Sequence, residues 1–582
     1  METAQQLGAP RTDAGGLGAR WQVEADAVEF GTRARLASGG LQLQARSGDV
    51  QLRPEADIDV SGRDVAFFDA SRGTWGGDVA LVADQGSVRV AEGARIDVSS
   101  ARGADGGRLT ARAVNGQIDI GAGSLRGAAV ADANGLRGDG AVARFEAGTL
   151  ANASALNAAL GDGFGGERSL RARSGDIDVA ADQVVRAERI ELAADAGSIN
   201  LRGQLIANGD DGGRVQAHAG QSLTLHGGAV IEARSTGGGD GGRVELGAGG
   251  GSLALDTGAR VDVSAAAAPG VQAGRINLRA RRVGSDVAVT SLGADIRGAG
   301  NVDLEAVRVY EGVNTLNATG GSSGAVLSLA TITGNDTAFA GNHAAIRTRL
   351  GQADNAAFHV VSGTEVRSTG NLALGNGTAA TDWNLATAGA GGEPGVLTLR
   401  AEGNLLINSH LSDGFSAAAP ITGTTPASVL PDSTRGGRSW SYRLVAGADA
   451  QAADPTATRT GVGDVTVASG KVVRTGTGDI EVAAGRDVVL ASNTSTIYTA
   501  GRLSGDVAGF TNPITLQRAT FTQGGGDVRI EAGRDITGAP STQLFSDWLF
   551  RQGRTDADGA AYLTGQQGTP AWWVRFDQFA QG

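Results

Sequence analysis

The pentapeptide Asp-Gly-Gly-Arg-Val occurs twice in this chain, starting at Asp211 and again at Asp240. Ser-Leu-x-Leu follows each copy, and Gly-Ala-x-Ile or Gly-Ala-x-Val comes after that. Related stretches contain Gly-Gly at Gly76 and Gly106, and "AGRINLRA" continues the series from Ala273. The copies are spaced by roughly 29 to 32 residues, which is a period typical of solenoid proteins.

Each repeat predicts three short β-strands. In the copy that starts at Gly76 they run from Val79 to Ala83, from Val88 to Val90 and from Arg95 to Val98. Apolar and polar residues alternate in these segments, which is the period-2 pattern of a strand with one buried face. Gly, Asp, Asn and Ser separate the strands and supply turns.

Strands this short need partners from neighbouring repeats, because a hairpin of two short strands is hardly stable alone. If each strand pairs with its equivalent in the next repeat, the repeats become the coils of a parallel β-helix. The chain contains 94 Gly and 41% hydrophobic residues but only 4% aromatic ones, and small apolar side chains suit a thin stacked core. The expected fold is all-β: a parallel β-helix (solenoid) with loop excursions.

The strength of the repeat varies along the chain and predicts five regions. An irregular start is followed by a regular solenoid, a solenoid with longer loops, renewed regular coils and an aromatic excursion. In residue numbers these are 1–19, 20–309, 310–395, 396–540 (with a Pro/Ser/Thr-rich loop near 411–437) and 541–582.

Composition and charge exclude several function classes. The net charge is −12 and Lys471 is the only lysine, so no basic surface for nucleic acid is expected. No apolar run reaches the roughly 18 residues that a transmembrane helix needs. Cysteine is absent from all 582 positions, which suits both a cytosolic protein and a chain that crosses a membrane unfolded.

Several segments carry a resemblance to a known family. They are "AGRDVVL", "GDVRIEAGRDITG", "RTGTGDIEVAAGRDV" and above all "RSWSYRLVAGADAQAADP", from Arg438 to Pro455. These segments resemble the filamentous haemagglutinin-like exoproteins of two-partner secretion, in the subgroup linked to cell-surface signalling. The repeats extend the resemblance over most of the chain, and the segment from Val396 to Gly582 is its more specific part.

The resemblance implies a right-handed β-helix that is exported through an outer-membrane β-barrel transporter. It implies an extracellular or cell-surface location in a Gram-negative bacterium, and a receptor on a host or neighbouring cell as the partner. The family's secretion domain and a signal peptide are not found in the sequence. We therefore expect the chain to be a fragment of a longer exoprotein or a truncated reading frame.

Two groups of residues are candidates for partner binding. Arg137-Gly138-Asp139 forms an integrin-type triplet in the loop-like setting "NGLRGDGAV", although chance supplies roughly half to one such triplet at this composition. Trp548, Trp572 and Trp573 lie in the aromatic segment near the C-terminus, where exposed rings would form a binding patch. The alternative for these tryptophans is a cap that shields the solenoid from edge-to-edge aggregation.

No catalytic, cofactor-binding or metal-binding residue is predicted. The Asp-Gly-Gly-Arg turns lack the helix that a dinucleotide site requires, and the tandem calcium-binding nonapeptide is not matched. His218 and His226 fall on outward positions of adjacent strands without a third ligand, and we expect both to be solvated. Outward carboxylates such as Asp97 and Asp262 are spread along the coils instead of converging in one groove.

The predicted function is therefore that of a secreted or surface-exposed adhesin, a rigid rod without enzyme activity. A polysaccharide-active β-helix enzyme and the stalk of a contact-dependent toxin are the alternatives. In this interpretation Gly212-Gly213 and Gly241-Gly242 are corners of two coils, and the core contains Val215, Leu223, Leu225, Val244, Leu253 and Leu255. Val244→Asp should then disrupt the stack, whereas Glu245→Ala should be nearly silent.

Overall fold

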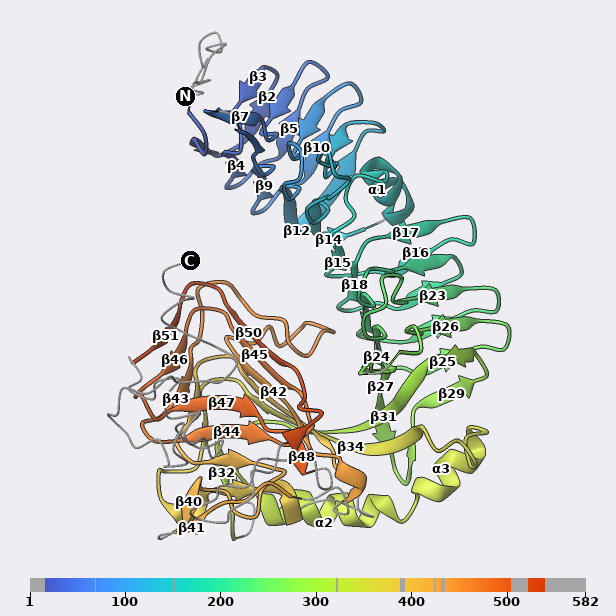
Figure 1. Ribbon diagram of the computed structural model, residues 1–582, viewed down its shortest axis with the longest axis vertical. Helices are drawn as coiled ribbons and strands as arrows, with labels where there is room; N and C mark the ends of the chain where they lie inside the picture. The colour runs from blue at the N-terminus through green and yellow to red at the C-terminus, as the bar shows by residue number, and fades with distance from the viewer. Residues whose placement is uncertain are drawn as a thin grey trace, which may run out of the picture. The chain divides into compact units, whose positions relative to one another are not determined.

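The computed structural model describes residues 16–539 except 69, 151, 269, 321–322, 388–392, 423–424, 431–434 and 504–521. It contains two compact units. Unit 1 comprises residues 1–306, 344–360 and 451–454, and unit 2 comprises 307–343, 361–450 and 455–582. Both units are built from short strands that pair in parallel with strands of the preceding and following coil (Figure 1). This confirms the predicted parallel β-helix, whereas the hand of the coil stays a prediction.

Most coils of unit 1 contribute strands at three successive positions, and the strands at each position pair in parallel. The strand at residues 108–120 occupies the first two positions, and the coil at 142–166 has a described strand at the first position only. At the first position lie β1 (Arg20–Ala25), β4 (Gly40–Ala45), β9 (Asp78–Ala83), β12 (Arg108–Ile120), β14 (Val142–Thr149), β15 (Glu167–Ala172), β18 (Arg189–Ala194), β21 (Arg214–Ala219), β24 (Arg243–Ala248), β27 (Gly274–Val283) and β31 (Ala299–Tyr310), the last of which continues into unit 2. At the second lie β2 (Val28–Phe30), β5 (Val50–Leu52), β10 (Val88–Val90), β16 (Ile177–Val179), β19 (Ile199–Leu201), β22 (Leu223–Leu225), β25 (Leu253–Leu255) and β29 (Val289–Leu292). At the third lie β3 (Arg33–Arg35), β6 (Asp57–Asp59), β11 (Arg95–Asp97), β13 (Leu125–Arg126), β17 (Val184–Arg186), β20 (Gln204–Ile206), β23 (Val230–Glu232), β26 (Arg260–Asp262) and β30 (Asp295–Arg297).

Unit 2 repeats this plan with longer connections. Its first ladder contains β34 (Phe358–Ser368), β37 (Val396–Ala401), β42 (Ser441–Ala446), β45 (Ile480–Ala484) and β50 (Val528–Ala532). Its second contains β32 (Thr315–Asn317), β33 (Val326–Ser328), β35 (Leu372–Leu374), β38 (Leu405–Ile407), β43 (Val465–Val467), β46 (Val488–Leu490) and β51 (Ile536–Gly538). Its third contains β36 (Trp383–Asn384), β39 (Leu411–Ser412), β44 (Val472–Thr475) and β47 (Thr496–Thr499), and single turns of 3-10 helix lie at Ala379–Thr381, Leu385–Thr387 and Arg435–Gly437.

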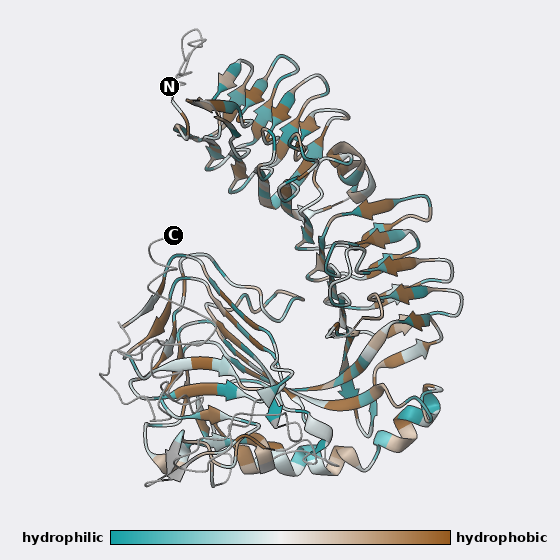
Figure 2. Ribbon diagram, viewed as in Figure 1, coloured by the Kyte–Doolittle hydropathy of each residue, from teal (hydrophilic) through white to brown (hydrophobic). Residues whose placement is uncertain are grey.

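The register confirms the core predicted from the repeat. Val215 pairs with Val244, Val244 pairs in turn with Ile276, and Leu223 pairs with Leu253. All of these side chains are fully buried, and Figure 2 shows hydrophobic and hydrophilic segments alternating along the strands. One such rung runs through Leu43, Leu81, Ala111, Phe145, Leu170, Leu192, Ala217, Leu246 and Leu278. Burial of each Leu in this rung stabilises the coil by about 1.5–3 kcal/mol.

The Gly-Gly corners allow the coils to approach one another. A Cβ atom on Gly212 would lie 2.1 Å from the amide nitrogen of Gly242 in the next coil. The same atom on Gly241 would lie 2.3 Å from the amide nitrogen of Gly274. No side chain fits at these distances, so the Asp-Gly-Gly-Arg repeat is a structural turn, as its sequence predicted.

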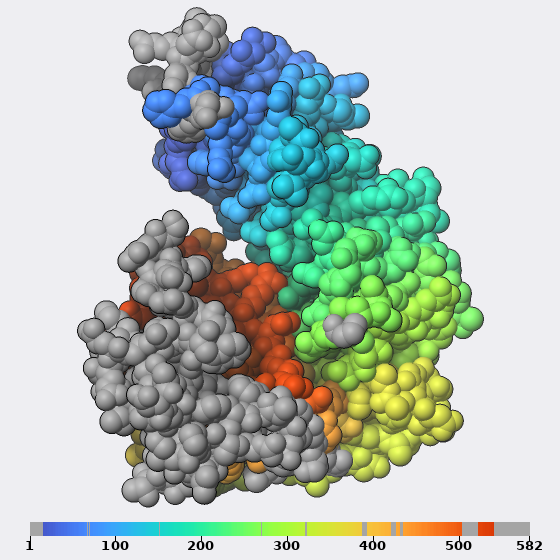
Figure 3. Space-filling model, in the orientation of Figure 1, coloured from blue at the N-terminus to red at the C-terminus, as the bar shows by residue number. Residues whose placement is uncertain are grey.

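The coil length is more variable than the predicted period. Glu167 and Arg189, which are register partners, are 22 residues apart, whereas Arg243 and Arg275 are 32 apart. The ladder tolerates this range because only the strands must align, and extra residues leave the coil as loops. In Figure 3 the colour of unit 1 passes gradually from blue through cyan to green, in the order of the sequence.

Within the described residues three α-helices interrupt the coils, where the sequence predicted only solenoid coils and loops. They are α1 (Ala153–Leu160), α2 (Leu329–Ala340) and α3 (His343–Arg349). The side chain of Asn152 caps α1 and that of Ser328 caps α2, each by accepting a hydrogen bond from a backbone amide. Small and β-branched residues and the internal Gly334 weaken the helical pattern of α2, which explains why the prediction missed it.

The remaining strands form antiparallel hairpins that leave the coils. They are β7 (Asp64–Phe67) with β8 (Ala70–Gly73), β28 (Asp286–Val287) against the end of β27, β40 (Ile421–Thr422) with β41 (Thr425–Pro426), and β48 (Arg502–Leu503) with β49 (Thr522–Gln523). The hairpin of β40 and β41 lies in the segment predicted as a Pro/Ser/Thr-rich loop. The coils therefore serve as a scaffold from which hairpins, turns and helices project.

Candidate functional site

The Arg137-Gly138-Asp139 triplet follows an ordered turn between β13 and β14. The side chain of Asp132 accepts hydrogen bonds from the amide nitrogens of Asn134 (2.8 Å) and Leu136 (2.9 Å). An Asx-type turn of this kind defines the backbone without help from a regular ladder. Leu136, directly before the triplet, is 68% exposed.

The backbone of the triplet is held while two of its side chains face solvent. The amide of Asp139 donates to Oδ1 of Asp105 (2.9 Å), and the carbonyl of Asp139 accepts from the amide of Gly106 (2.8 Å). A Cβ on Gly138 would lie 2.4 Å from the carbonyl carbon of Ala104, so only Gly fits. Arg137 and Asp139 are both exposed. The structure thus presents a guanidinium and a carboxylate on a defined backbone, as a partner would require.

The aromatic candidates cannot be placed in the same way. Trp548, Trp572 and Trp573 lie outside the residues that the structure describes. Whether they form a binding patch or a cap stays a prediction.

An exposed aromatic feature in unit 1 was not anticipated. Phe68 lies at the tip of the hairpin of β7 and β8, fully exposed and with φ of +51°, a backbone conformation that bulky residues seldom adopt. Trp75, at the base of this hairpin, is 56% exposed. The adjacent Phe67-Phe68 pair before Asp-Ala-Ser-Arg-Gly was the available signal, because two large apolar residues in a polar turn break the repeat.

Many charged side chains on the coils bind charged groups of neighbouring coils. Glu167 is almost fully buried and lies between two arginines: Nε of Arg144 is 2.5 Å from its Oε1, and Nε of Arg189 is 3.4 Å from its Oε2. Burial opposes the charged form, but the two arginines together lower the pKa of Glu167. Such carboxylates form ion pairs between coils and are not free to bind a ligand.

The carboxylates Asp97 and Asp262, which the sequence analysis placed on the outer face of the coils, also bind local partners. Asp97 is buried, pairs with Arg95 at 2.7 Å and accepts a hydrogen bond from the amide of Ser99. Asp262 is buried as well and accepts from both the amide and the hydroxyl of Ser264. In the described part of the chain no group of three or more His, Cys, Asp or Glu side chains could hold a metal ion.

The histidine prediction was half wrong. His226 is partly exposed, as expected, but His218 is only 3% exposed, and its Nε2 lies 3.4 Å from Oε1 of the buried Glu245. The alternation rule placed His218 on the outer face correctly, yet an outer face is not solvated where other groups cover it. Glu245 is likewise only 3% exposed, so we no longer expect Glu245→Ala to be silent.

A different kind of site lies in unit 2, where Arg474 of β44 is buried. Its guanidinium lies 3.8 Å from the ring centroid of Phe415. It donates hydrogen bonds to Oγ of Ser412 (2.9 Å) and to the hydroxyl of Tyr498 (3.0 Å). It also donates to the carbonyls of Ala417, Ala418 and Ala419, at 2.8, 3.1 and 3.2 Å. One side chain therefore fixes the start of the loop that contains β40 and β41.

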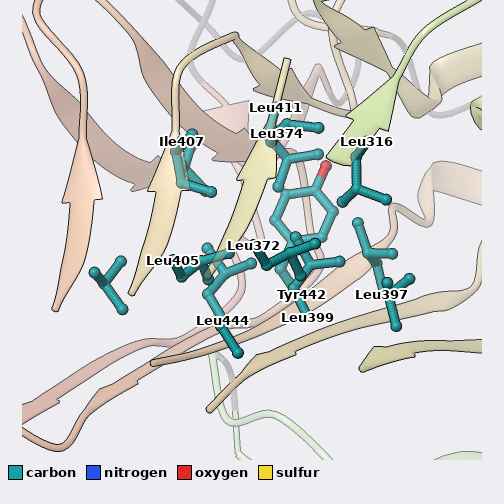
Figure 4. Packing of buried hydrophobic residues seen from close by; sticks show 14 of the residues in the cluster. Leu316, Leu372, Leu374, Leu397, Leu399, Leu405, Ile407, Leu411, Tyr442 and Leu444 are labelled. Carbon is teal, nitrogen blue, oxygen red and sulfur yellow. The ribbon is translucent and has the colours of Figure 1, made fainter. Parts of the chain in front are cut away.

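Asp413 holds the other end of the same loop. It is 1% exposed by side chain, accepts a hydrogen bond from the amide of Trp440 (2.6 Å) and lies 3.4 Å from Nη1 of Arg435. Burial raises the pKa of Asp413 in spite of Arg435. Trp440 and Tyr442, from the segment with the most specific family resemblance, are buried core residues; Figure 4 shows the ring of Tyr442 among leucines.

The repeated Ala-Gly-Arg-Asp segments of unit 2 also have a structural role. Arg486 binds Asp464 of the preceding coil (Nε to Oδ1, 2.7 Å), and Arg534 binds Asp487 in the same way (2.9 Å). The amide of Asp487 donates to Asp464, and the amide of Asp535 donates to Asp487. In each segment the Arg side chain and the Asp amide thus donate to an Asp of the preceding coil. The carboxylate of Asp487 in turn accepts the hydrogen bonds from the next coil. The hydrogen bonds from the arginines lower the pKa values of Asp464 and Asp487.

One cluster in unit 2 has the composition of a hydrolytic site but not its geometry. Ser409, His410 and Asp382 lie together. The hydroxyl of Ser409 bonds to that of Thr381 (2.6 Å), while Nδ1 of His410 accepts the amide of Val472 (3.2 Å). Burial lowers the pKa of His410. The imidazole nitrogen that would act as a base is therefore occupied by the backbone.

None of the helices in the described segments combines the length and the apolar character needed to cross a membrane. Comparison of the chain with models of protein families, with curated proteins and with solved structures finds no match.

Proposed function

We propose that this protein is a secreted or cell-surface exoprotein of the filamentous haemagglutinin-like type, in which a β-helical scaffold carries adhesive excursions. The observation that supports this most is a difference between charged side chains on the coils and those on the Arg137–Asp139 turn. Charged side chains on the coils, such as Glu167 and Asp464, bind neighbouring coils, whereas Arg137 and Asp139 on a projecting turn are exposed. A scaffold with ordered projecting loops is a common way to display binding residues.

Export through an outer-membrane β-barrel partner belongs to the same proposal. The chain has no cysteine, so no disulfide forms before it reaches the outside. Each coil pairs only with its neighbours, as the register of β21 with β18 and β24 illustrates. A chain that emerges from a pore can therefore fold coil by coil without waiting for distant segments.

Attachment to cells tests the adhesive role. Beads coated with the purified chain are expected to bind host or bacterial cells more than tenfold better than albumin-coated beads. The variant Arg137→Gln/Asp139→Asn should lose most of this binding, because it removes both charges and leaves the hydrogen-bonded backbone intact. Arg46→Gln/Glu24→Gln neutralises another exposed pair and serves as the matched control.

The outcomes distinguish a wrong adhesive function from a wrong assignment of the binding site to Arg137 and Asp139. Absence of binding to every cell type would contradict the adhesive function. Full binding by the Arg137→Gln/Asp139→Asn variant would instead show that a different surface carries it.

Refolding from denaturant tests coil-by-coil assembly. The purified chain should regain its β-sheet circular dichroism after dilution from urea without any added factor. If the purified chain did not regain β-structure without added factors, assembly driven by contacts between neighbouring coils would be contradicted.

A further inference from the structure

Three successive corners of unit 1 carry the loops that lead into β9, β12 and β14. These strands are neighbours in the first ladder, so the loops before them also follow one another along the stack (Figure 1). The loops cover residues 62–76, 100–106 and 127–141, and the last of them contains the Arg137–Asp139 turn.

Backbone hydrogen bonds join these loops to one another. The amide of Ala101 donates to the carbonyl of Thr74 (2.9 Å), which connects the first loop to the second. The amide of Gly103 donates to the carbonyl of Val130 (2.8 Å), which connects the second loop to the third. The three loops therefore form one continuous surface, which we call the loop surface.

Most exposed apolar side chains of unit 1 lie on the loop surface. Among the described residues, unit 1 exposes six large apolar side chains, and four of them belong to these loops. The four are Phe68 (108% exposed), Trp75 (56%), Val130 (40%) and Leu136 (68%). Single apolar residues scattered over a surface need no explanation, but a group of them marks a site of interaction.

The backbone of Phe68 also indicates a binding role. Its φ of +51° suits Gly or Asn, and a bulky residue in this conformation raises the energy of the turn. Packing within unit 1 does not offset this energy, because the ring is fully exposed. A strained residue with no internal contacts is typical of a segment that binds a partner.

The charges on the loop surface have both signs. Its exposed charged residues include Arg72, Arg102 and Arg137 as well as Asp64, Asp105 and Asp139. A polyanion or an anionic bilayer would be repelled by the three aspartates, so neither suits this surface. Aromatic rings and arginines beside charges of both signs are instead typical of an interface between two proteins.

We infer that the loop surface binds a protein on the partner cell, with Phe68 and Trp75 as apolar anchors beside Arg137 and Asp139. Such a protein offers an apolar hollow to the two rings, an acidic group to Arg137 and a basic group to Asp139. A glycan fits less well, because aliphatic side chains such as that of Leu136 offer it neither a hydrogen bond nor an aromatic face. The inference rests on the proposed adhesive function and names the class of its partner.

Binding of coated beads to cells measures the contribution of the two rings. Phe68→Asn/Trp75→Ser should lower binding about tenfold or more, because it removes both anchors while Asn tolerates the positive φ. Phe68→Leu keeps an apolar side chain and should retain most of the binding. Val283→Ser is the matched control, since Val283 is an apolar residue of unit 1 that is 51% exposed and lies outside the three loops.

Treatment of the cells identifies the class of the partner. Protease treatment should abolish binding of the unmodified chain, whereas periodate oxidation of surface glycans should leave it intact. Binding that survives protease, binding that periodate abolishes, or equal binding to vesicles of phosphatidylglycerol would overturn the assignment to a protein.

The variants also separate this inference from the proposed function. Unchanged binding by Phe68→Asn/Trp75→Ser would show that the rings are not anchors, but it would leave the adhesive function standing. Absence of binding of the unmodified chain to every cell type would contradict both.

Discussion

The two units solve the same packing problem with different side chains. The core of unit 1 is almost purely aliphatic, with rungs such as Val215, Val244 and Ile276 in which each member is replaceable by another. Unit 2 also buries Trp383, Trp440, Tyr442 and Arg474. None of these large side chains is repeated along a rung, and each contacts its own partners. The difference follows from the length of the loops. A long loop between coils needs specific contacts that hold it in place, whereas a short turn needs no such contacts.

The largest expected effect comes from a charge placed in a rung of either unit. Val244→Asp puts a carboxylate at a fully buried position and should destabilise its coils by about 4 kcal/mol or more. In unit 1 the damage should fade along the stack, so that amide hydrogen exchange accelerates in β21, β24 and β27 but not in β4 and β9. Val244→Ala, which keeps the rung apolar, is the control.

Val482→Asp makes the same change in unit 2 and tests the comparison directly. Here exchange should also accelerate outside the adjacent strands, since anchors such as Arg474 join residues that are 57 positions apart. If the exchange pattern of Val482→Asp were as local as that of Val244→Asp, the proposed difference between the units would be wrong.

Loss of the arginine anchor ranks next. Arg474→Met keeps an unbranched apolar side chain against Phe415 but removes the hydrogen bonds to Ser412, Tyr498 and the three carbonyls of 417–419. Deletion of one partner of a buried polar network costs about 1–3 kcal/mol, and here the loss falls on the loop start. Limited proteolysis should therefore cut near 417–419 in Arg474→Met well before it cuts the unmodified chain. Arg486→Met, which removes a half-exposed arginine of the same unit, should leave this cleavage rate unchanged.

A smaller effect is expected for Glu245→Ala in unit 1. Glu245 is 3% exposed and lies 3.4 Å from the buried His218, which would lose its acidic neighbour. We expect a loss of about 1–2 kcal/mol in the urea unfolding of unit 1, where a surface change would stay within about 0.5 kcal/mol. Glu24→Ala, in an exposed pair with Arg46, provides the surface control. Equal urea midpoints for the two variants would mean that burial of Glu245 contributes nothing.

These residues show how far the sequence predicts the structure. Period-2 alternation assigned Val215, Leu223, Val244 and Leu253 to the core correctly, because neighbours along one strand decide which face is buried. The same rule placed His218 and Glu245 on the outer face but could not tell that this face is covered. Cover depends on groups that are distant in sequence, and no local pattern encodes them.

The candidate sites were harder to predict for the same reason. The Arg137–Asp139 triplet could be read from three adjacent letters, and its exposure agrees with the loop-like sequence around it. A pocket on unit 2 is lined by residues from four separate segments of the chain (311, 367–369, 400–402 and 448–450), and only the register of β34 with β37 brings Arg367 and Arg400 together. A motif search along the sequence has no signal for such a site.

The smallest effect is a difference in pH dependence, and it has opposite signs in the two units. The folded-state pKa of Glu167 in unit 1 is lowered, so its contribution to stability is present above its unfolded pKa of about 4.3 and is lost as the pH falls. The folded-state pKa of Asp413 in unit 2 is raised by burial, so its contribution is present below about 3.9 and is lost as the pH rises through the raised value.

Urea unfolding between pH 3.5 and pH 7, followed by hydrogen exchange so that each unit reports separately, measures both signs. Glu167→Gln should flatten the loss of unit 1 stability toward acid, and Asp413→Asn should flatten the loss of unit 2 stability above pH 4, because each variant removes its titrating group. Asn and Gln keep an oxygen that accepts the hydrogen bonds of Trp440 and Arg144. Parallel changes of the same sign in both variants would mean that burial does not outweigh Arg435 at Asp413, and that its carboxylate is a structural tie like that of Glu167.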